Sequence, residues 1–418
     1  MAWSRDKIHR GKAKKLFVFS VKLVGYIVWK LSCLFPRSKN KWLFGDVMGF
    51  AGNTKYVLID FLKHNEKYHY HLIWITHNKQ LLPQIRQFGI EAYYWLEPKA
   101  IWHCLTAGCY IVTSNTKDIN CYLSGNAFYY NFWHGIGLKA VGKQSAEYLK
   151  VPERKRNNFY YKVLFFYWAH RLPDICLTTS EFMLRNIFMK QFGQPEESFI
   201  LGMYPRAEFM LRPKEDILNF AEKYCLDSEC HFIRRLYRWK KVYIYMPTWR
   251  DNGKNIMVEA GLNFDMLHKS LLKNNSVLLL KFHSKTRIKV DEICKYDNIY
   301  LIDNNWDIYP ILPFTDCLIT DYSSIYSEYM LMNKEVIIFE YDKTTMNEDR
   351  GLPPYFEEKT PGIRISTFSQ LLNLIDSNKD CHLNEKDLQN VLETYWSARN
   401  IKIDFYNDIR KHLFGKFD

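Results

Sequence analysis

The chain has 418 residues, of which 47% are hydrophobic, so it can fill two cores of ordinary size and is not an intrinsically disordered protein. Its formal net charge is +13, and its ten cysteines form neither a paired framework nor a Cys-x-x-Cys motif, which favours a reducing, cytoplasmic setting over a disulfide-bonded secreted protein. His64, His69 and His71 lie close in sequence without a matching ligand pair, so we predict no metal site.

The positive charge is concentrated at the N-terminus. The first 41 residues contain eleven lysines and arginines against one acid, a local balance of +10. An apolar run from Leu16 to Phe35 follows, and Lys22 and Lys30 interrupt it. We interpret residues 1–40 as a basic amphipathic helix that lies on an anionic membrane surface. A membrane-spanning anchor and an ordinary core helix are the alternatives, whereas the lack of a small-residue cleavage site argues against a secretory signal peptide.

From residue 41 onward, short apolar runs alternate with helical patterns, which is typical of parallel sheets covered by helices. The first series of expected strands is Trp42–Val47, Leu72–Thr76, Cys109–Ser114, Phe128–Trp133, Ile175–Thr179 and Phe199–Leu201. The helices expected between them are Thr54–Lys63, Leu81–Gln87, Lys99–Thr106 and Glu181–Gln191.

A polar, charged stretch from Lys214 to Lys241 precedes a second series of strands. These are Val242–Met246, Val277–Phe282, Ile299–Ile302, Cys317–Thr320 and Val336–Phe339. We therefore predict two α/β domains, 41–225 and 226–418, that face one another, with the last helix packing back on the first. Ligands of such sheets bind at the carboxyl ends of the strands.

Several of the predicted strands end in groups suited to chemistry on an anion. His134 follows the strand that ends at Trp133 and precedes Gly135, where a ligand could reach it and exchange a proton near neutral pH. Thr248 and Arg250 follow Met246, and the guanidinium offers a fork that matches phosphate. A single strand-end histidine or arginine is more often structural, so the argument depends on their number.

The third predicted strand end of this kind is Lys281-Phe282-His283, in which a histidine lies between two cations. The fourth is Asp321-Tyr322-Ser323-Ser324, a polar turn between a buried strand and the helix expected from Ile325 to Met332. Unpaired N–H groups and serine hydroxyls at a helix start suit a phosphate, although an ordinary capped helix would have the same local pattern. Four such ends together indicate a cleft with one base and several anion-binding groups.

Other classes are not supported. The chain has no Walker-type Gly-x-x-x-x-Gly-Lys-Ser/Thr and no Gly-x-Gly-x-x-Gly after a strand, so neither an NTPase nor a dinucleotide enzyme is indicated. Basic-aromatic patches begin at Arg154 and at Arg234, but no nucleic-acid-binding fold accompanies them, so we predict no nucleic-acid partner.

In their order along the chain, these motifs resemble the CDP-glycerol glycerophosphotransferase family, the teichoic acid and capsule polymer synthases. The matching segments are Trp133-His134-Gly135 with Leu138-Lys139, Thr179-Ser180-Glu181-Phe182, Gly202 with Pro205-Arg206, Pro247-Thr248-Trp249-Arg250-Asp251, Lys281-Phe282-His283, Leu318-Ile319-Thr320-Asp321-Tyr322-Ser323-Ser324 and Arg350-Gly351. The resemblance covers about residues 100 to 365.

The resemblance implies a GT-B-like fold of two Rossmann-like domains, peripheral attachment to the cytoplasmic face of the bacterial membrane, and CDP-glycerol as the substrate, with no cofactor. The catalytic residues we expect are His134, as the base, and His283. Donor contacts are expected from Arg250, Thr248, Asp321, Ser323, Ser324 and Glu328. Phosphate or acceptor contacts are expected from Gly135, Lys139, Arg206, Lys281 and Arg350.

The implied reaction transfers glycerol phosphate from CDP-glycerol to a hydroxyl of a lipid-linked or polymeric acceptor and releases CMP. CDP-ribitol as the donor is one alternative, and a GT-B glycosyltransferase that uses a nucleotide sugar is another. A membrane-bound interaction protein with a dead site is the alternative from outside the enzymes.

Overall fold

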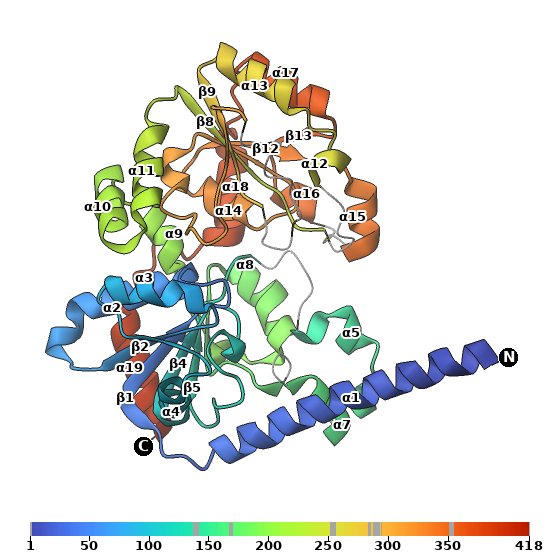
Figure 1. Cartoon of the computed structure of the whole chain (residues 1–418), viewed down its shortest axis with the longest axis vertical. Helices are drawn as coiled ribbons and strands as arrows, with labels where there is room; N and C mark the ends of the chain where they lie inside the picture. Colours follow the sequence, from blue (N-terminus) through green and yellow to red (C-terminus); the bar gives the residue numbers. More distant parts are fainter. Residues whose placement is uncertain are drawn as a thin grey trace.

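The structure, a computed structural model, describes the chain except residues 1, 137–141, 167–169, 251–255, 283–285, 287–292, 294, 351–354 and 418. Side chains are described neither for these residues nor for 2–14, 146, 347–350, 416 and 417. The described residues form two lobes, each built on one sheet, stacked along the long axis of the molecule (Figure 1).

The N-terminal lobe contains a seven-stranded sheet in which all neighbouring strands are parallel. In spatial order its strands are β3 (Ala92–Tyr94), β2 (His71–Thr76), β1 (Ser38–Gly45), β4 (Ala107–Val112), β5 (Phe128–Asn131), β6 (Ile175–Thr178) and β7 (Phe199–Leu201). Its main helices are α2 (Gly52–His64), α3 (Leu82–Gln87), α4 (Pro98–Thr106), α7 (Phe159–Leu164), α8 (Glu181–Met183), which continues as a π-helix over Leu184–Gly193, and α9 (Pro205–Met210). The central strand β4 is buried along its whole length, as expected for a parallel strand covered on both faces.

The C-terminal lobe contains a six-stranded sheet, also parallel throughout. In spatial order its strands are β10 (Ile299–Leu301), β9 (Ser276–Leu280), β8 (Lys241–Met246), β11 (Cys317–Thr320), β12 (Glu335–Phe339) and β13 (Ile363–Ile365). Its main helices are α10 (Lys214–Tyr224), α11 (Asp227–Leu236), α13 (Phe264–Lys273), α14 (Ile325–Met330), α15 (Lys343–Arg350), α17 (Phe368–Asp376) and α18 (Glu385–Trp396).

Each strand predicted from the sequence is present. The sequence analysis does not predict β3 and β13, which are three-residue strands at the sheet edges and too short to show periodicity. The polar stretch between the two strand series is not a linker, because it forms α10 and α11, whose apolar sides are buried.

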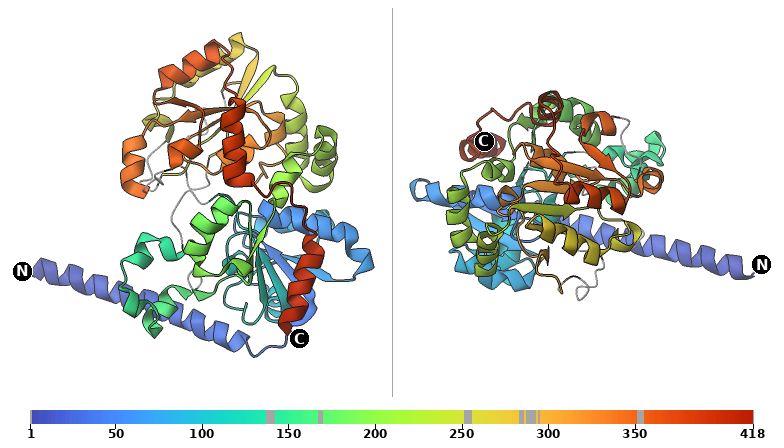
Figure 2. Two further views of the ribbon diagram at one scale, coloured as in Figure 1. Left: turned by 180° about the vertical axis from the view of Figure 1, so that it is seen from behind. Right: turned by 90° about the horizontal axis from the view of Figure 1, so that it is seen from above.

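The chain crosses back to the N-terminal lobe after α18. The amide of Ala398 donates to the carbonyl of Thr179 at 3.1 Å, and the last helix, α19 (Phe405–Phe417), then lies along the first sheet (Figure 2). Tyr130 on β5 donates to Asp408 of this helix at 3.0 Å. The C-terminal residues are therefore part of the N-terminal lobe.

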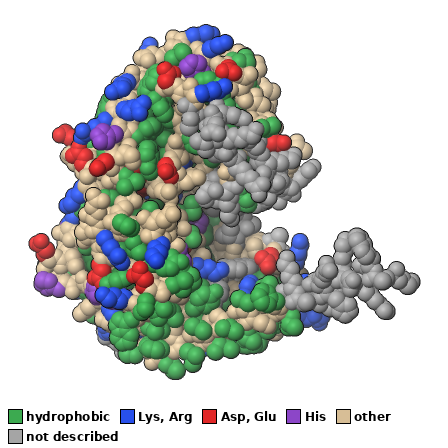
Figure 3. Space-filling model, viewed as in Figure 1, with side chains coloured by type: hydrophobic (Ala, Val, Ile, Leu, Met, Phe, Trp, Pro, Cys, Tyr) green, Lys and Arg blue, Asp and Glu red, His purple; other side chains and the backbone are tan. Residues whose placement is uncertain are grey.

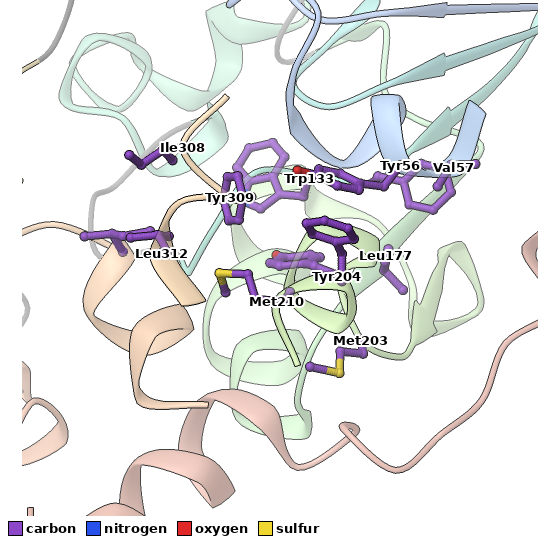
Figure 4. Packing of buried hydrophobic residues seen from close by; sticks show 14 of the residues in the cluster. Tyr56, Val57, Trp133, Leu177, Met203, Tyr204, Met210, Ile308, Tyr309 and Leu312 are labelled. Atoms are coloured by element: carbon purple, nitrogen blue, oxygen red, sulfur yellow. The ribbon is translucent and has the colours of Figure 1, made fainter. Parts of the chain in front are cut away.

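The two lobes share one hydrophobic core. Ile308, Tyr309 and Leu312 of the C-terminal lobe belong to the same buried cluster as Tyr56 and Trp133 of the N-terminal lobe (Figure 4). The rings of Tyr56 and Tyr309 meet edge to face at 6.4 Å. Burying one such side chain contributes roughly 1.5–3 kcal/mol, so this contact stabilises the observed arrangement of the lobes.

The N-terminal helix α1 (Ala2–Ser32) extends beyond the body of the molecule (Figure 1). Its inner side packs on α7 and the segment that follows: Phe19 stacks on Tyr160 at 4.7 Å, and Trp29 meets Phe166 at 4.5 Å. Lys22, which interrupts the apolar run, donates to the carbonyl of Leu164 at 2.7 Å. In the part of the chain that the structure describes, no helix combines the length and the apolar character needed to cross a membrane.

Candidate active site

His134 lies in a tight turn directly after β5. Trp133 has a φ of +54° and Gly135 a φ of +148°, both in the region that side chains rarely adopt. Trp133 is held there because its amide donates to Asn131 Oδ1 at 2.8 Å and its indole packs against Phe188. Such strained backbone at a strand end is typical of functional sites.

Three successive carbonyls of this turn each receive a side-chain hydrogen bond. Asn53 Nδ2 donates to the carbonyl of Trp133 at 2.8 Å, Arg206 Nη2 donates to that of His134 at 2.7 Å, and Tyr204 Oη donates to that of Gly135 at 3.1 Å. The turn is therefore fixed on its inner side. The side chain of His134 is surrounded by protein at the junction of the lobes, and part of its surface stays open to solvent.

The imidazole has a defined tautomer. Its Nδ1 lies 3.1 Å from the carbonyl oxygen of Thr113, and because a carbonyl can only accept, Nδ1 carries the proton and Nε2 keeps its lone pair. The surrounding protein lowers the pKa of His134 to about 4 by desolvating the charged form, and the positive charge of Arg206 lowers it further. His134 is therefore neutral at physiological pH. Its Nε2 keeps the lone pair that a base needs, while the lowered pKa makes it a weaker proton acceptor than a free imidazole.

The turn also contacts the opposite lobe. A Cβ added at Gly135 would lie only 2.8 Å from Ser324 Oγ, so only glycine fits there. Ser324 lies directly before α14, and the Oγ of the neighbouring Ser323 accepts from the amide of Ile325 at 3.5 Å. Both serines are half-buried. The turn that carries His134 therefore meets Ser324 where the two lobes face each other.

Arg250 does not present a free fork to the junction. Its guanidinium donates to Asp321 at 2.8 Å, to Asp342 at 2.6 and 2.9 Å, and to the carbonyl of Thr248. In this structure two carboxylates hold the guanidinium, and the expected contact of Arg250 with a phosphate stays a prediction. Asp321 also accepts from the amides of Thr248 and Tyr322, at 2.8 and 2.5 Å. It therefore joins the turn that begins at Asp321 to the segment that follows β8.

Thr248 is one of several residues around this turn whose buried hydroxyl has no hydrogen-bond partner among the described residues; the others are Tyr245, Tyr322 and Tyr341. In Thr248 the atom concerned is Oγ1. A buried hydroxyl without a partner costs about 1–3 kcal/mol, which a bound polar ligand would recover.

Glu328 and Arg206 form a buried ion pair between the lobes. Arg206 Nη2 and Nε donate to the two carboxylate oxygens at 2.6 and 3.1 Å, and Tyr309 Oη donates to one of them at 2.8 Å. Glu328 is 1% exposed and Arg206 7%. Each group is thus paired with the other, and the expected contacts of Glu328 with the donor and of Arg206 with phosphate stay predictions.

Lys281 is also hydrogen-bonded within the protein. Its Nζ donates to the carbonyl of Asp303 at 2.6 Å, and burial lowers its pKa to about 8, against the opposing pull of Asp303. His283 and Lys139 lie outside the described residues, as does the side chain of Arg350. Their expected roles stay predictions.

The sequence analysis did not identify several groups that shape the site. They are Thr113, Asn53 and Tyr204 around His134, Asp342 beside Arg250, and Asp46. Asp46 is buried at the end of β1, and burial raises its pKa to about 6, although the amide of Met48 donates to it at 2.8 Å. Asp46 lies near the end of the first predicted strand, and this position of a polar residue could have identified it as a candidate from the sequence.

Among the described residues, only Glu335, Asp380 and His382 bring three potential metal ligands together. Lys241 Nζ lies 2.8 Å from Glu335, so an ammonium already neutralises this group. The histidines that are close in sequence, His64, His69 and His71, form no such cluster there. A cavity of about 650 Å³ lies between α2, α9 and the segment before α19, and His134 does not line it.

Two facing parallel α/β lobes with a histidine at their junction define a GT-B-like fold. The wall teichoic acid polymerase TagF has the same fold, with a TM-score of 0.71 at 20% identity, over 98% of this chain and 99% of that one. The family described as CDP-Glycerol:Poly(glycerophosphate) glycerophosphotransferase matches residues 29–402. The chain belongs to this family.

Relatives of the chain include two polymerases of Bacillus spizizenii. A teichoic acid poly(glycerol phosphate) polymerase is 25% identical over 391 residues, which is 88% of this chain and 90% of the relative. A teichoic acid poly(ribitol-phosphate) polymerase is 26% identical over 353 residues, which is 83% of this chain but only 52% of the relative. The chain thus spans about half the length of the second.

Proposed function

We propose that this protein transfers glycerol phosphate from CDP-glycerol to a hydroxyl of a membrane-linked or polymeric acceptor and releases CMP, in the synthesis of teichoic acid or another cell-surface polymer. Membership of the family and the names of the relatives support the reaction. The single observation that carries the mechanism is the neutral imidazole of His134, whose Nδ1 is held by Thr113 and whose Nε2 is left to act as the base.

In the proposed step, the acceptor hydroxyl gives its proton to Nε2 of His134 while its oxygen attacks the phosphorus that bears glycerol. The bond from this phosphorus to the bridging oxygen breaks, and CMP leaves with the electron pair. Phosphoryl transfer depends mainly on positioning and charge stabilisation, so one oriented base and a set of donors suffice.

The donor would lie against the C-terminal lobe. Ser323 and Ser324 are proposed to donate to its phosphates. Thr248 Oγ1, which has no partner among the described residues, is proposed as a third donor. Arg250 would act indirectly, by holding Asp321 and the turn that carries the serines. His283 is proposed as the cation that neutralises the leaving group, and Lys139 and Arg350 as further phosphate contacts.

We propose residues 41–225 as the acceptor domain, residues 226–418 as the donor domain and residues 1–40 as the membrane-associating segment. These bounds follow the lobes except at α10, which belongs to the C-terminal lobe, and at α19, which lies on the N-terminal one. Strand β1 begins at Ser38, so the last residues of the range 1–40 belong to the first sheet. The membrane-associating segment is therefore α1.

Peripheral attachment to the cytoplasmic face of the membrane is supported by the outer side of α1. Opposite the side that packs on α7 runs a stripe of exposed apolar side chains, and Figure 3 shows an apolar band along the corresponding edge of the molecule. The stripe consists of Leu16, Phe17, Val21, Val24, Ile27, Leu31 and Leu34. Apolar insertion together with the basic lead-in is the combination that holds an interfacial helix on anionic lipid.

One experiment tests the donor. The protein is incubated with CDP-glycerol, CDP-ribitol and UDP-sugars in separate reactions with a glycerol-phosphate-primed acceptor, and released CMP or UDP is measured. We expect CMP from CDP-glycerol. Release from CDP-ribitol alone would favour the second candidate, which the ribitol-phosphate polymerase among the relatives suggests. Release of UDP alone would overturn the proposal.

A further inference from the structure

The carbonyl of His134 is bonded by a residue whose own position is set from the other lobe. Arg206, at the start of α9, donates one Nη2 proton to this carbonyl at 2.7 Å. The same nitrogen and Nε also donate to Glu328 of α14. A continuous set of hydrogen bonds thus runs from the C-terminal lobe to the backbone of the proposed base.

Several contacts besides the ion pair hold Arg206 in place. Its guanidinium lies 4.7 Å from the ring centre of Tyr309, whose hydroxyl donates to Glu328 at 2.8 Å, and its backbone amide donates to Asn53 Oδ1 at 3.2 Å. Asn53 in turn bonds the carbonyl of Trp133. Arg206 is therefore aligned from both lobes, and its bond to His134 depends on both.

A second buried ion pair between the lobes serves as a comparison. Lys55 of α2 donates to Asp307 at 2.9 Å, and Tyr56 donates to the same oxygen at 2.8 Å. Like the first pair, it joins a cation of the N-terminal lobe to a carboxylate of the C-terminal lobe and includes a tyrosine. Unlike Arg206, Lys55 makes no side-chain hydrogen bond to the described residues of the turn that carries His134.

Stability alone does not explain the Arg206–Glu328 pair. The desolvation of two buried charges offsets most of their attraction, so the net contribution of such a pair is often close to zero. What the pair does provide is direction, because two bonds from Nε and Nη2 to one carboxylate fix the plane of the guanidinium and with it the direction of the second N–H of Nη2. That N–H is the one that meets the carbonyl of His134.

We propose that Arg206 is a positioning residue for His134 and that Glu328 sets it from the opposite lobe, so that the base is correctly oriented only while the lobes are together. The inference rests on the proposed function in taking His134 as the base. It assigns Arg206 and Glu328 no contact with donor or acceptor. A small displacement of an oriented group is enough to slow a reaction about 10²-fold, so loss of either bond is expected to reduce turnover.

The test compares two isosteric neutralisations, Glu328→Gln and Asp307→Asn, each of which removes the carboxylate of one interlobe pair. Both are expected to change thermal stability to a similar extent. Only Glu328→Gln should lower kcat for CMP release, by about 10²-fold, with the KM for CDP-glycerol changed by less than about threefold. Arg206→Lys, which keeps the charge but loses the fork, should behave like Glu328→Gln.

Hydrogen exchange gives a readout that needs no turnover. Deuterium uptake of the peptide over residues 130–136 should rise in Glu328→Gln and stay at the wild-type level in Asp307→Asn. Equal uptake in both variants would overturn the inference, whether or not the wild-type protein turns over CDP-glycerol. An unchanged kcat in Glu328→Gln, with an active wild type, would overturn the inference and leave the proposed function standing.

Discussion

The bond from His134 Nδ1 to the carbonyl oxygen of Thr113, 3.1 Å long, determines which imidazole nitrogen is available at the junction of the lobes. Nδ1 is the donor in this bond, so Nε2 is unprotonated. A base that keeps its lone pair in this way needs no further residue to set its tautomer. The proposed chemistry therefore depends on a backbone carbonyl that no sequence motif identifies.

Replacing His134 by asparagine should reduce CMP release from CDP-glycerol by about 10²–10⁴-fold, because a general base contributes that much to the rate. Binding of CDP-glycerol, measured by calorimetry, should be nearly unchanged, since the base faces the acceptor. His64→Asn on the surface of α2 is the matched control. Wild-type turnover in His134→Asn would remove the base assignment.

The pH dependence of kcat/KM should reflect a histidine that stays neutral. Desolvation lowers the pKa of His134 to about 4, so the imidazole is largely unprotonated from about pH 5 upward. We expect kcat/KM to stay level as the pH falls from 8 through 6.5 and to decline only towards pH 4, with circular dichroism at each pH to verify folding. An acid limb at pH 6.5 or above would contradict this electrostatic account.

Asp46→Asn should make the protein more stable at neutral pH. Burial raises the pKa of Asp46 from 3.8 to about 6, so the folded state binds the proton more tightly than the unfolded state. The ionised carboxylate therefore destabilises the fold above pH 6, and this penalty disappears as the pH falls from 6 towards 3.8. The difference in unfolding free energy should be on the order of 3 kcal/mol at pH 7.5, since each pKa unit corresponds to about 1.4 kcal/mol, and should fall below about 1 kcal/mol at pH 4.

Urea denaturation at both pH values measures this difference. Asp60→Asn, an exposed aspartate on α2, is the control and should show neither effect. A variant Asp46→Asn that is less stable than the wild type at pH 7.5 would mean that the ionised carboxylate is needed by the fold.

Arg250→Ala should cost about 3–5 kcal/mol of unfolding free energy, because it leaves the carboxylates of Asp321 and Asp342 beside each other without their cation. The midpoint of denaturation in urea measures the loss, and Arg238→Ala on the exposed part of α11's C-terminal turn is the control. If Arg250→Ala were as stable as the wild type and lost only donor affinity, the guanidinium would be a phosphate ligand and not the holder of the turn.

The triple variant Phe17→Glu, Val24→Glu, Leu31→Glu should abolish binding to vesicles that contain anionic lipid, since each change places a charge in the exposed stripe of α1. Its thermal stability should be unchanged, because these side chains do not face α7. Vesicle sedimentation measures binding. The control carries three equivalent changes at exposed apolar positions of the C-terminal lobe, Val258, Met266 and Leu272. Equal binding of both variants would sink the membrane proposal.

Part of the site was predictable because parallel strands point their carboxyl ends the same way. The alternation of apolar runs and helical patterns placed His134, Arg250 and Asp321 at strand ends, and the structure has β5, β8 and β11 at those positions. The pattern could not tell which of these groups face a ligand. It treated Arg250 as free because Asp342, its second partner, is 92 residues away.

The two parallel α/β lobes, the family and a histidine at a strand end could all be predicted from the sequence, because hydrophobic periodicity and short motifs are local properties. The partner of each charged group could be identified only in the folded structure. Arg206 and Glu328 are 122 residues apart in sequence, yet they form an ion pair, and Arg206 also donates to the carbonyl of His134. A buried charge must find a partner in space, and the fold, not the neighbouring sequence, supplies it.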